Sequence, residues 1–309
     1  MPTENGVFLF CLQARQGGVK DMAKRKVEWT QQKYEKFLKE KRGQGEGEDY
    51  LPWLNIQSFP SLGRVSRVFS NKTGRIHHFL SDIQTNVFYI YSFMDYVIDI
   101  REHYPLLSIN GLLGNLDKYG LGKYNNYNNQ DKPPTIVTTT FLITTKSKDG
   151  EIGYIARSVK NSNELDRKHV IEMMELQRRY WDAKNIDWGI ITQKEINKTR
   201  AKNIEWALSS LYDNDDETES LTPTIQDSLE NELLDRLKNA SSQPVRDICI
   251  ELEKEYDLRA GEGILLFRRL VAKKKILIEM EKNIDLSKKS NKILTIPKEG
   301  GSNGKSIIS

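Results

Sequence analysis

The 309-residue chain has few of the residues on which several protein classes depend. Two cysteines, Cys11 and Cys249, cannot build a zinc site, and nothing indicates the disulfide framework of a secreted domain. The only strongly apolar stretch near the start, residues 7–11, is too short for a signal-peptide core, and no run reaches transmembrane length. We therefore expect a cytoplasmic protein without a membrane partner.

An excess of charge of one sign is also lacking. The chain has 47 Lys and Arg residues against 43 Asp and Glu, which gives a net charge of +4 and a pI near 8.8. Such a mildly basic balance is compatible with nucleic-acid binding but does not establish it. With 29% charged and 38% hydrophobic residues, the composition is that of a globular chain, and its length allows two domains.

Shifts in composition divide the chain. The first residues differ in character from the rest of the chain, and a second start-like sequence, MAKRKVEWT, begins at Met22. An acidic run, DNDDETE, interrupts the later part of the chain. We expect a disordered or spurious extension at 1–25, a first domain at 26–210, an acidic linker at 211–222, a second domain at 223–296 and a disordered polar tail at 297–309.

The stretch from Gly74 to Leu107 predicts a loop, an amphipathic helix and a strand. Ser81 suits the N-cap position, and Gln84 three residues later completes a capping box. Apolar residues then recur at helical spacing on one face, namely Ile83, Val87, Ile90, Tyr91 and Met94. The next strand contains Asp99. This helix and strand are expected to organise the core of the first domain.

The remaining pattern predicts a further helix at 26–41, a strand hairpin at 136–146 and 151–160, a helix at 164–183, a strand at 188–192 and a helix ending near 208. Two loops separate these elements. Residues 42–54 are rich in glycine, but no helix start or Lys-Ser/Thr pair comes after them, so a phosphate loop is not favoured. Residues 109–134 are rich in Gly, Asn and Tyr, and we expect a long exposed loop.

Beyond the acidic run, helices are expected near 224–239, 244–256 and 261–273, and strands at 275–280 and 292–296. Three helices and a β-wing are the order of a winged helix. Basic side chains on the third helix and wing are candidates for contacts with DNA phosphates or with a protein partner: Arg268, Arg269, Lys273, Lys274 and Lys275. The same charges are equally typical of the solvated face of a helix.

The order of elements in the first domain is that of an α/β restriction-endonuclease-like core, a mixed sheet flanked by helices. Such nucleases hold Mg²⁺ with carboxylates, and the metal activates water and neutralises charge on the phosphate. A neighbouring lysine stabilises the charge that develops. The expected pattern is an acid on the helix, an acid on one hairpin strand and acid-x-Lys on the other.

Several segments in the same order resemble the TnsA family: RGQGEGEDYLPWL (42–54), SNKTGRIHHFLSDIQ (70–84), VIDIREHYPLL (97–107), ELQRRYWDAKNIDW (175–188), KEINKTRAKNIEW (194–206) and EYDLRAGEGILLFRRLVAKKKILI (255–278). The resemblance implies an Mg²⁺-dependent endonuclease subunit that cuts the five-prime ends of a bacterial transposon. It also implies three partners: a TnsB-like transposase, a TnsC-like ATPase regulator and transposon-end DNA. A nucleoid-associated complex is the implied location.

The active-site positions implied by this resemblance have changed chemistry. Gln84 stands where the family has a helix glutamate, and Thr140 where it has an aspartate before a Phe-Leu pair. Ser158 and Lys160 match the family's Gln-x-Lys, and only Lys160 keeps its type. Both anionic ligands are then replaced by neutral groups, so Mg²⁺ binding is expected to be weak or absent. We expect a catalytically degenerate subunit that acts in complex assembly and DNA binding.

Two alternatives remain open from the residues alone. The first is an active nuclease with a relocated carboxylate, for which Asp82, Asp99 and Glu35 are the candidates. His77 and His78 are also possible ligands, although packing is the plainer interpretation of these two residues. The second alternative is a DNA-binding regulator that acts through the winged-helix domain.

Overall fold

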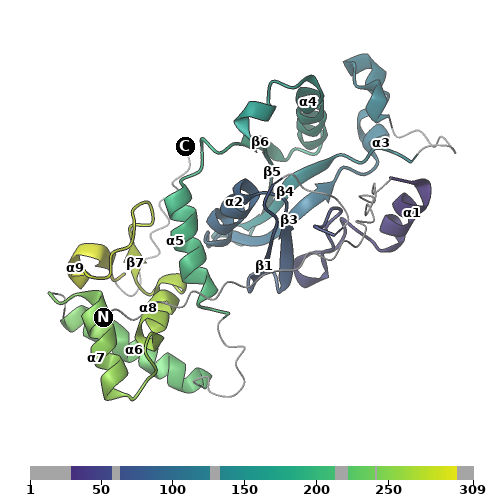
Figure 1. The fold of residues 1–309 in the computed structure, drawn as a ribbon. Helices are drawn as coiled ribbons and strands as arrows, with labels where there is room; N and C mark the ends of the chain where they lie inside the picture. The colour runs from purple at the N-terminus through teal and green to yellow at the C-terminus, as the bar shows by residue number, and fades with distance from the viewer. Residues whose placement is uncertain (1–28, 58–62, 126–132, 213–221, 241, 298–309) are drawn as a thin grey trace, which may run out of the picture.

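The computed structural model describes residues 29–57, 63–125, 133–212, 222–240 and 242–297 (Figure 1). The expected N-terminal extension and most of the expected acidic linker and polar tail lie outside the described residues.

A four-stranded mixed sheet forms the centre of the N-terminal part. Its strand order is β3 (Val97–Pro105), β4 (Thr138–Lys146), β5 (Ile152–Val159) and β6 (Asp187–Ile191). β3 pairs with β4, and β4 with β5, in antiparallel fashion, whereas β6 runs parallel to β5. The predicted hairpin is therefore confirmed, and α4 (Lys168–Asp182) connects β5 to its parallel neighbour. This arrangement fits the expected restriction-endonuclease-like core.

Each face of the sheet is covered by different elements because successive strand residues point to opposite sides. Phe141 and Ile143 belong to a cluster that includes α2 (Asp82–Ser92) and α5 (Lys198–Ser209). Leu142 lies in a second cluster with Leu176 and Trp181 of α4. Because both faces are covered, β4 is buried along most of its length, threonines included.

Residues 109–125 are not the exposed loop that their composition predicts. They form α3 (Ile109–Leu113) and two short 3₁₀ helices, η2 (Leu116–Tyr119) and η3 (Gly122–Tyr124). These helices extend the second cluster with four buried side chains, those of Ile109, Leu116, Leu121 and Tyr124. The prediction was wrong because leucines spaced among glycines and asparagines lack a regular period, yet they still bury apolar area over α4.

The segment before the sheet packs through aromatic rings and a hairpin. Helix α1 (Gln31–Lys39) precedes a 3₁₀ helix, η1 (Gly47–Asp49), in the glycine-rich region. Phe37 lies edge-on to Trp53, with ring centroids 5.3 Å apart, and both are buried. The antiparallel pair β1 (Ser66–Ser70) and β2 (Arg75–Phe79) then leads directly into α2.

The C-terminal part has the three expected helices, α6 (Pro223–Asn239), α7 (Val245–Glu255) and α8 (Glu262–Ala272). The expected strands are much shorter than predicted. β7 (Leu277–Ile278) pairs with β8 (Leu294–Thr295), and an isolated bridge joins Pro244 to Lys289. Helix α9 (Ser290–Ile293) occupies the start of the second predicted strand. A polar, lysine-rich connection has too few apolar residues to bury a longer β ladder.

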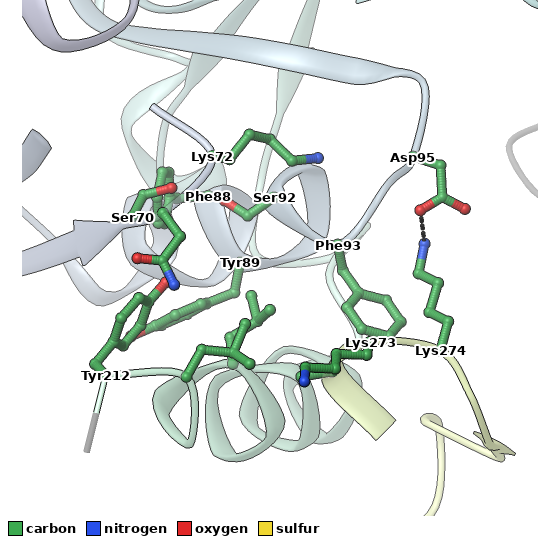
Figure 2. A pocket seen from close by; sticks show the side chains of 14 residues that line it. Ser70, Lys72, Phe88, Tyr89, Ser92, Phe93, Asp95, Tyr212, Lys273 and Lys274 are labelled. Atoms are coloured by element: carbon green, nitrogen blue, oxygen red, sulfur yellow. Dashed lines mark hydrogen bonds and ion pairs between the residues drawn. The ribbon is translucent and has the colours of Figure 1, made fainter. Parts of the chain in front are cut away.

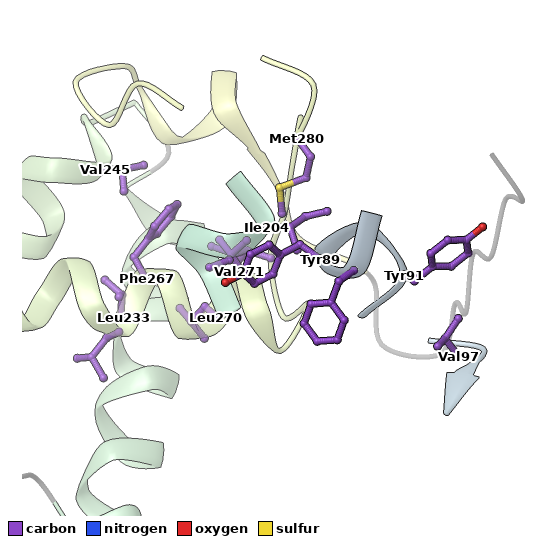
Figure 3. Close-up of a cluster of buried hydrophobic side chains, with 14 of the residues drawn as sticks. Tyr89, Tyr91, Val97, Ile204, Leu233, Val245, Phe267, Leu270, Val271 and Met280 are labelled. Carbon is purple, nitrogen blue, oxygen red and sulfur yellow. The ribbon is translucent and has the colours of Figure 1, made fainter. Parts of the chain in front are cut away.

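The two parts of the chain share one hydrophobic core (Figure 3). Helix α5 lies between α2 and α8, and its Ile204 is buried in the same cluster as Tyr89 of α2 and Val271 of α8. Met280, which lies in the segment after β7, is also buried in this cluster. Packing of this kind fixes the position of the C-terminal helices relative to the sheet.

Candidate functional site

Gln84 caps the start of α2 with its side-chain oxygen. The backbone N–H of Gln84 donates to Ser81 Oγ over 3.3 Å, and Gln84 Oε1 accepts the N–H of Leu80 over 2.8 Å. The capping-box prediction is thus confirmed at Ser81, with the returning bond one residue earlier than in the ideal motif. Because Leu80 supplies a donor, the amide oxygen must face it, and Nε2 points away with no protein partner among the described residues.

Thr140 lies just beyond the last register pair of β4 and β5, which joins Phe141 to Arg157. Its hydroxyl oxygen accepts the backbone N–H of Val159 over 2.9 Å, a bond that a backbone carbonyl makes in a regular ladder. The side chain is only 8% exposed. The rings of Phe79 and Phe141 lie 6.0 Å apart, which brings the segment before α2 next to this part of β4. Gln84 and Thr140 therefore lie at the same end of the sheet.

Ser158 is held on the other side of the sheet. Its hydroxyl donates to Gln177 Oε1 over 2.6 Å and accepts the indole N–H of Trp188 over 3.0 Å. Gln177 belongs to α4, whereas Gln84 belongs to α2, which covers the opposite face. The structure thus does not bring the Ser158 side chain together with Gln84.

Lys160 comes directly after the last residue of β5. Its backbone N–H donates to the carbonyl of Ile191 over 3.1 Å, which extends the pairing with β6. The half-buried side chain makes no ion pair with a carboxylate in the described part of the chain. It lies near the buried His103, whose pKa is lowered first by burial and also by the neighbouring Lys160 cation.

A buried ionic network beside these positions was not anticipated. Glu102 is fully buried, and its carboxylate accepts two bonds from Arg75, over 2.9 and 2.6 Å. His77 Nδ1 lies 2.8 Å from the same carboxylate, and the His78 backbone N–H donates to it over 3.2 Å. Burial opposes ionisation, but His77 and Arg75 outweigh it and hold the pKa of Glu102 well below its ordinary value. Glu102 inside a predicted strand was the available signal, whereas Arg75 and His77 lie in β2, a strand where the sequence pattern predicts a loop.

The histidines of this network are buried and neutral. Burial lowers the pKa of His77, and its two ring nitrogens are used, Nδ1 towards Glu102 and Nε2 towards the Thr73 hydroxyl at 2.8 Å. His103 donates from Nε2 to the carbonyl of His78 over 3.0 Å. The backbone of His103 has a φ of 51°, a left-handed conformation that non-glycine residues rarely adopt.

Because both ring nitrogens of His77 are hydrogen-bonded, His77 has no lone pair left for a metal.

The three acids considered as replacements lie elsewhere. Asp99 accepts backbone N–H groups of Gly47 and Ile100, over 3.2 and 2.8 Å. It pairs in register with Thr144, four residues along β4 from Thr140, or roughly 13 Å at the rise of a strand. Asp82 is mostly exposed, and Glu35 is exposed on α1 with a bond to Gln31, so these two lie outside the site.

The five basic residues proposed for DNA or partner contacts all bind other parts of the chain. Arg269 is buried and donates to Glu230 over 2.8 Å, and Arg268 donates to the carbonyl of Trp206 over 2.9 Å. The remaining three make ion pairs or hydrogen bonds through their ammonium groups, namely Lys273 with Asp227 and Glu230, Lys274 with Asp95, and Lys275 with Asn231. These contacts join α8 to α5, α6 and the segment before β3. Their role in binding DNA stays a prediction.

A cavity of about 370 Å³ lies where the two parts of the chain meet (Figure 2). Lys72 lies at its rim and donates to the carbonyl of Met94 over 2.6 Å. Burial, assisted by the cation of Lys274, lowers the pKa of Lys72 to about 8. The aromatic part of the lining consists of Phe88, Tyr89, Phe93 and Tyr212.

The mixed sheet and two sequence matches define the class of this protein. Residues 94–193 match the family described as TnsA-like endonuclease N terminal, and residues 195–280 match TnsA endonuclease C terminal. The chain is also 36% identical to the Transposon Tn7 transposition protein TnsA of Escherichia coli over 251 residues. The aligned region covers 81% of this chain and 87% of that relative. The chain therefore belongs to the TnsA family of transposase endonuclease subunits.

The residues at the family site do not fit Mg²⁺. This ion prefers anionic oxygen ligands in octahedral geometry, whereas Gln84 offers a neutral amide and the Thr140 oxygen already accepts a backbone N–H. Within the described ranges, no three His, Cys, Asp or Glu side chains lie together in a way that holds a metal ion. In the same ranges, no helix combines the length and apolar character needed to cross a bilayer.

Proposed function

We propose that this chain is a TnsA-type subunit that joins a transposase complex and binds transposon-end DNA without cutting it. The observation that carries the proposal is the neutral chemistry of Gln84 and Thr140, at the two positions where the resemblance to the family implies acids. Lys160 is then the charged group of the site that keeps its type. A TnsB-like transposase and a TnsC-like ATPase are the partners, acting on DNA in the bacterial cytoplasm.

There is a physical reason why the fold can be kept when the nuclease activity is lost. Gln84 satisfies a backbone N–H at the start of α2 as a glutamate would, so loss of the carboxylate leaves the helix capped. The Glu102–Arg75 pair lies in the interior and holds β2 against β3 independently of the site. The cap therefore needs only an oxygen acceptor at position 84, whereas metal binding needs a charge there, so catalysis can be lost while the fold remains.

We also propose a winged-helix role for the C-terminal part. Three helices and a short antiparallel pair after them support this interpretation. The basic side chains from Arg268 to Lys275 stay candidates for contacts with DNA or the ATPase, and their bonds within the molecule would hold them in place for such contacts.

The products of transposition test the proposed function. If the five-prime ends stay uncut while a TnsB-like transposase joins the three-prime ends, replication converts the branched product into a cointegrate. A transposon that carries this chain as its sole TnsA copy is expected to give cointegrates. Simple insertions, lost when Lys160→Ala is introduced, would overturn the proposal. Detection of joined three-prime ends serves as the control for correct assembly.

A further inference from the structure

The cavity between the two parts of the chain takes no part in the functions proposed above. Its volume of about 370 Å³ is within the range of small-molecule sites, roughly 300–1,000 Å³. Its lining comes from the turn between β1 and β2, from α2, from the end of α5 and from the residues after α8 (Figure 2). A ligand in this cavity would therefore contact both parts of the chain.

Ser92 presents an unpaired hydroxyl group at this cavity. It is the last residue of α2, its side chain belongs to the lining, and the residue is only 8% exposed. Its Oγ is buried and has no hydrogen-bond partner in the part of the chain that the structure describes. A buried polar group without a partner is unfavourable, and a hydroxyl can both donate and accept. Ser92 is therefore suited to bind a polar group of a ligand.

The charged groups around the cavity favour an anion. Three lysines and one acid belong to the lining, namely Lys72, Lys273, Lys274 and Asp95. Lys274 is bound to Asp95, and Lys273 is bound to acids of α6. Lys72 donates to the neutral carbonyl of Met94 and makes no ion pair with an acid in the described ranges. With a pKa of about 8 it is mostly protonated at neutral pH, so its other N–H donors are available to an anion.

Aromatic rings form the apolar part of the lining. Phe88 and Tyr89 of α2 have ring centroids 5.7 Å apart, Phe93 follows at the end of the helix, and Tyr212 comes from the segment after α5. An edge-on contact with Phe69, at 5.6 Å between ring centroids, holds Tyr212 in place. Aromatic side chains bind another ring through stacked or edge-on contacts. The cavity therefore combines a surface for an aromatic ring with donors for an anionic group.

We propose that the cavity binds a small aromatic anion, with its carboxylate or phosphate group at Lys72 and Ser92 and its ring against the aromatic side chains. Anionic oxygens accept the bonds that the ammonium group and the hydroxyl donate. Ser92 and Gln84 lie roughly 12 Å apart along the axis of α2, so this site is separate from the family's nuclease position. The inference does not depend on whether the chain cuts DNA. A bound anion would hold the C-terminal part against α2.

The test uses the full chain and four small probes at matched ionic strength. Phenylacetate and phenyl phosphate carry a ring and an anionic group, phenylacetamide carries the ring without the charge, and acetate carries the charge without the ring. Calorimetric titration gives each Kd. Because a ligand that binds the folded state raises Tm, each aromatic anion is expected to raise Tm by about 2–4 °C near ten times its Kd. At the same concentrations phenylacetamide and acetate are expected to raise it by less than about 1 °C.

The two aromatic anions also identify the ligand class, since the one with the lower Kd shows whether the site prefers a carboxylate or a phosphate ester. Ser92→Ala is expected to weaken the binding of that anion about two- to tenfold. The same change is expected to leave the Tm of the free chain no lower than that of the wild type, because the hydroxyl has no partner to lose.

Lys72→Met is expected to weaken anion binding by at least about tenfold, since it removes a charged donor. Lys282→Met removes an exposed lysine outside the cavity, and as the matched control it should leave Kd within about twofold of wild type. If Lys72→Met folds poorly, the Ser92→Ala comparison still decides the question.

Equal Tm shifts with phenylacetate and phenylacetamide, or no shift with either aromatic anion, would overturn the proposal. Anion binding that survives both Ser92→Ala and Lys72→Met unchanged would also overturn it, because the anion would then lie elsewhere. A lower Tm of the free Ser92→Ala chain would contradict the assignment of this hydroxyl to a ligand and would favour a structural role.

Discussion

The side-chain oxygen of Gln84 lies 2.8 Å from the backbone nitrogen of Leu80, across the start of α2. The resemblance of the surrounding segment to the TnsA family implies a metal-binding glutamate at the same position. One side chain thus keeps the structural task of that position and lacks its charge. This separation of stability from chemistry, together with the buried charges around it, leads to four predictions.

Gln84→Ala removes the cap and the hydrogen bond that Gln84 Oε1 accepts from the Leu80 N–H. We expect the free energy of unfolding to fall by about 1 kcal/mol. Gln84→Glu keeps an acceptor at the same place and is expected to be close to neutral. Urea denaturation monitored by circular dichroism measures both. Equal losses for the two variants would show that the Leu80 contact contributes nothing.

Glu102→Gln leaves the Arg75 guanidinium buried without its counter-charge. We expect a loss of about 3–5 kcal/mol, since removal of one partner from a buried ion pair leaves an uncompensated charge. The control is Asp187→Asn, which removes the partner of Arg157 from a pair whose carboxylate is 67% exposed. That change is expected to cost less than about 1 kcal/mol. Comparable losses for the two variants would contradict the account of the network.

Acid is expected to destabilise the protein through its buried histidines. Burial lowers the pKa of His77, His78 and His103 in the folded chain, so between those values and the ordinary value of about 6.5 the unfolded chain binds more protons. Stability therefore falls as the pH drops below about 6.5. The unfolding free energy at several pH values is the measurement, and His103→Gln is expected to make its pH dependence shallower. A pH dependence unchanged by this substitution would contradict the assignment.

Lys72 gives a pH dependence in the alkaline range. Its pKa of about 8 in the folded chain lies below the ordinary value of 10.5, so the unfolded chain binds more protons between these two values. Stability is therefore expected to rise as the pH increases through this range. Lys72→Met is expected to abolish that rise, although it loses the bond to Met94. Lys282→Met, at an exposed position, is the control and should keep the rise.

The order of elements was predictable because the hydrophobic periods of β4, β5, α2 and α4 are regular. The burial of residues 109–125 could not be predicted, since Leu116 and Leu121 fit no helical or strand period. The sequence also could not predict which residues a given side chain contacts. Ser158 bonds to Gln177 of α4 and to Trp188, on the face of the sheet opposite to Gln84. Arg269, on an apparently basic helix, binds a buried glutamate. Such pairings depend on how distant elements meet.

The central claim is that two side chains separate this chain from an active nuclease. The most direct measurement compares five-prime cleavage by the wild-type chain and by the Gln84→Glu/Thr140→Asp variant, each assembled with its transposase partners in Mg²⁺ or Mn²⁺. The account predicts no cleavage by the wild type and metal-dependent cleavage by the double variant, abolished again by Lys160→Ala. Clean cleavage by the wild-type chain would contradict it.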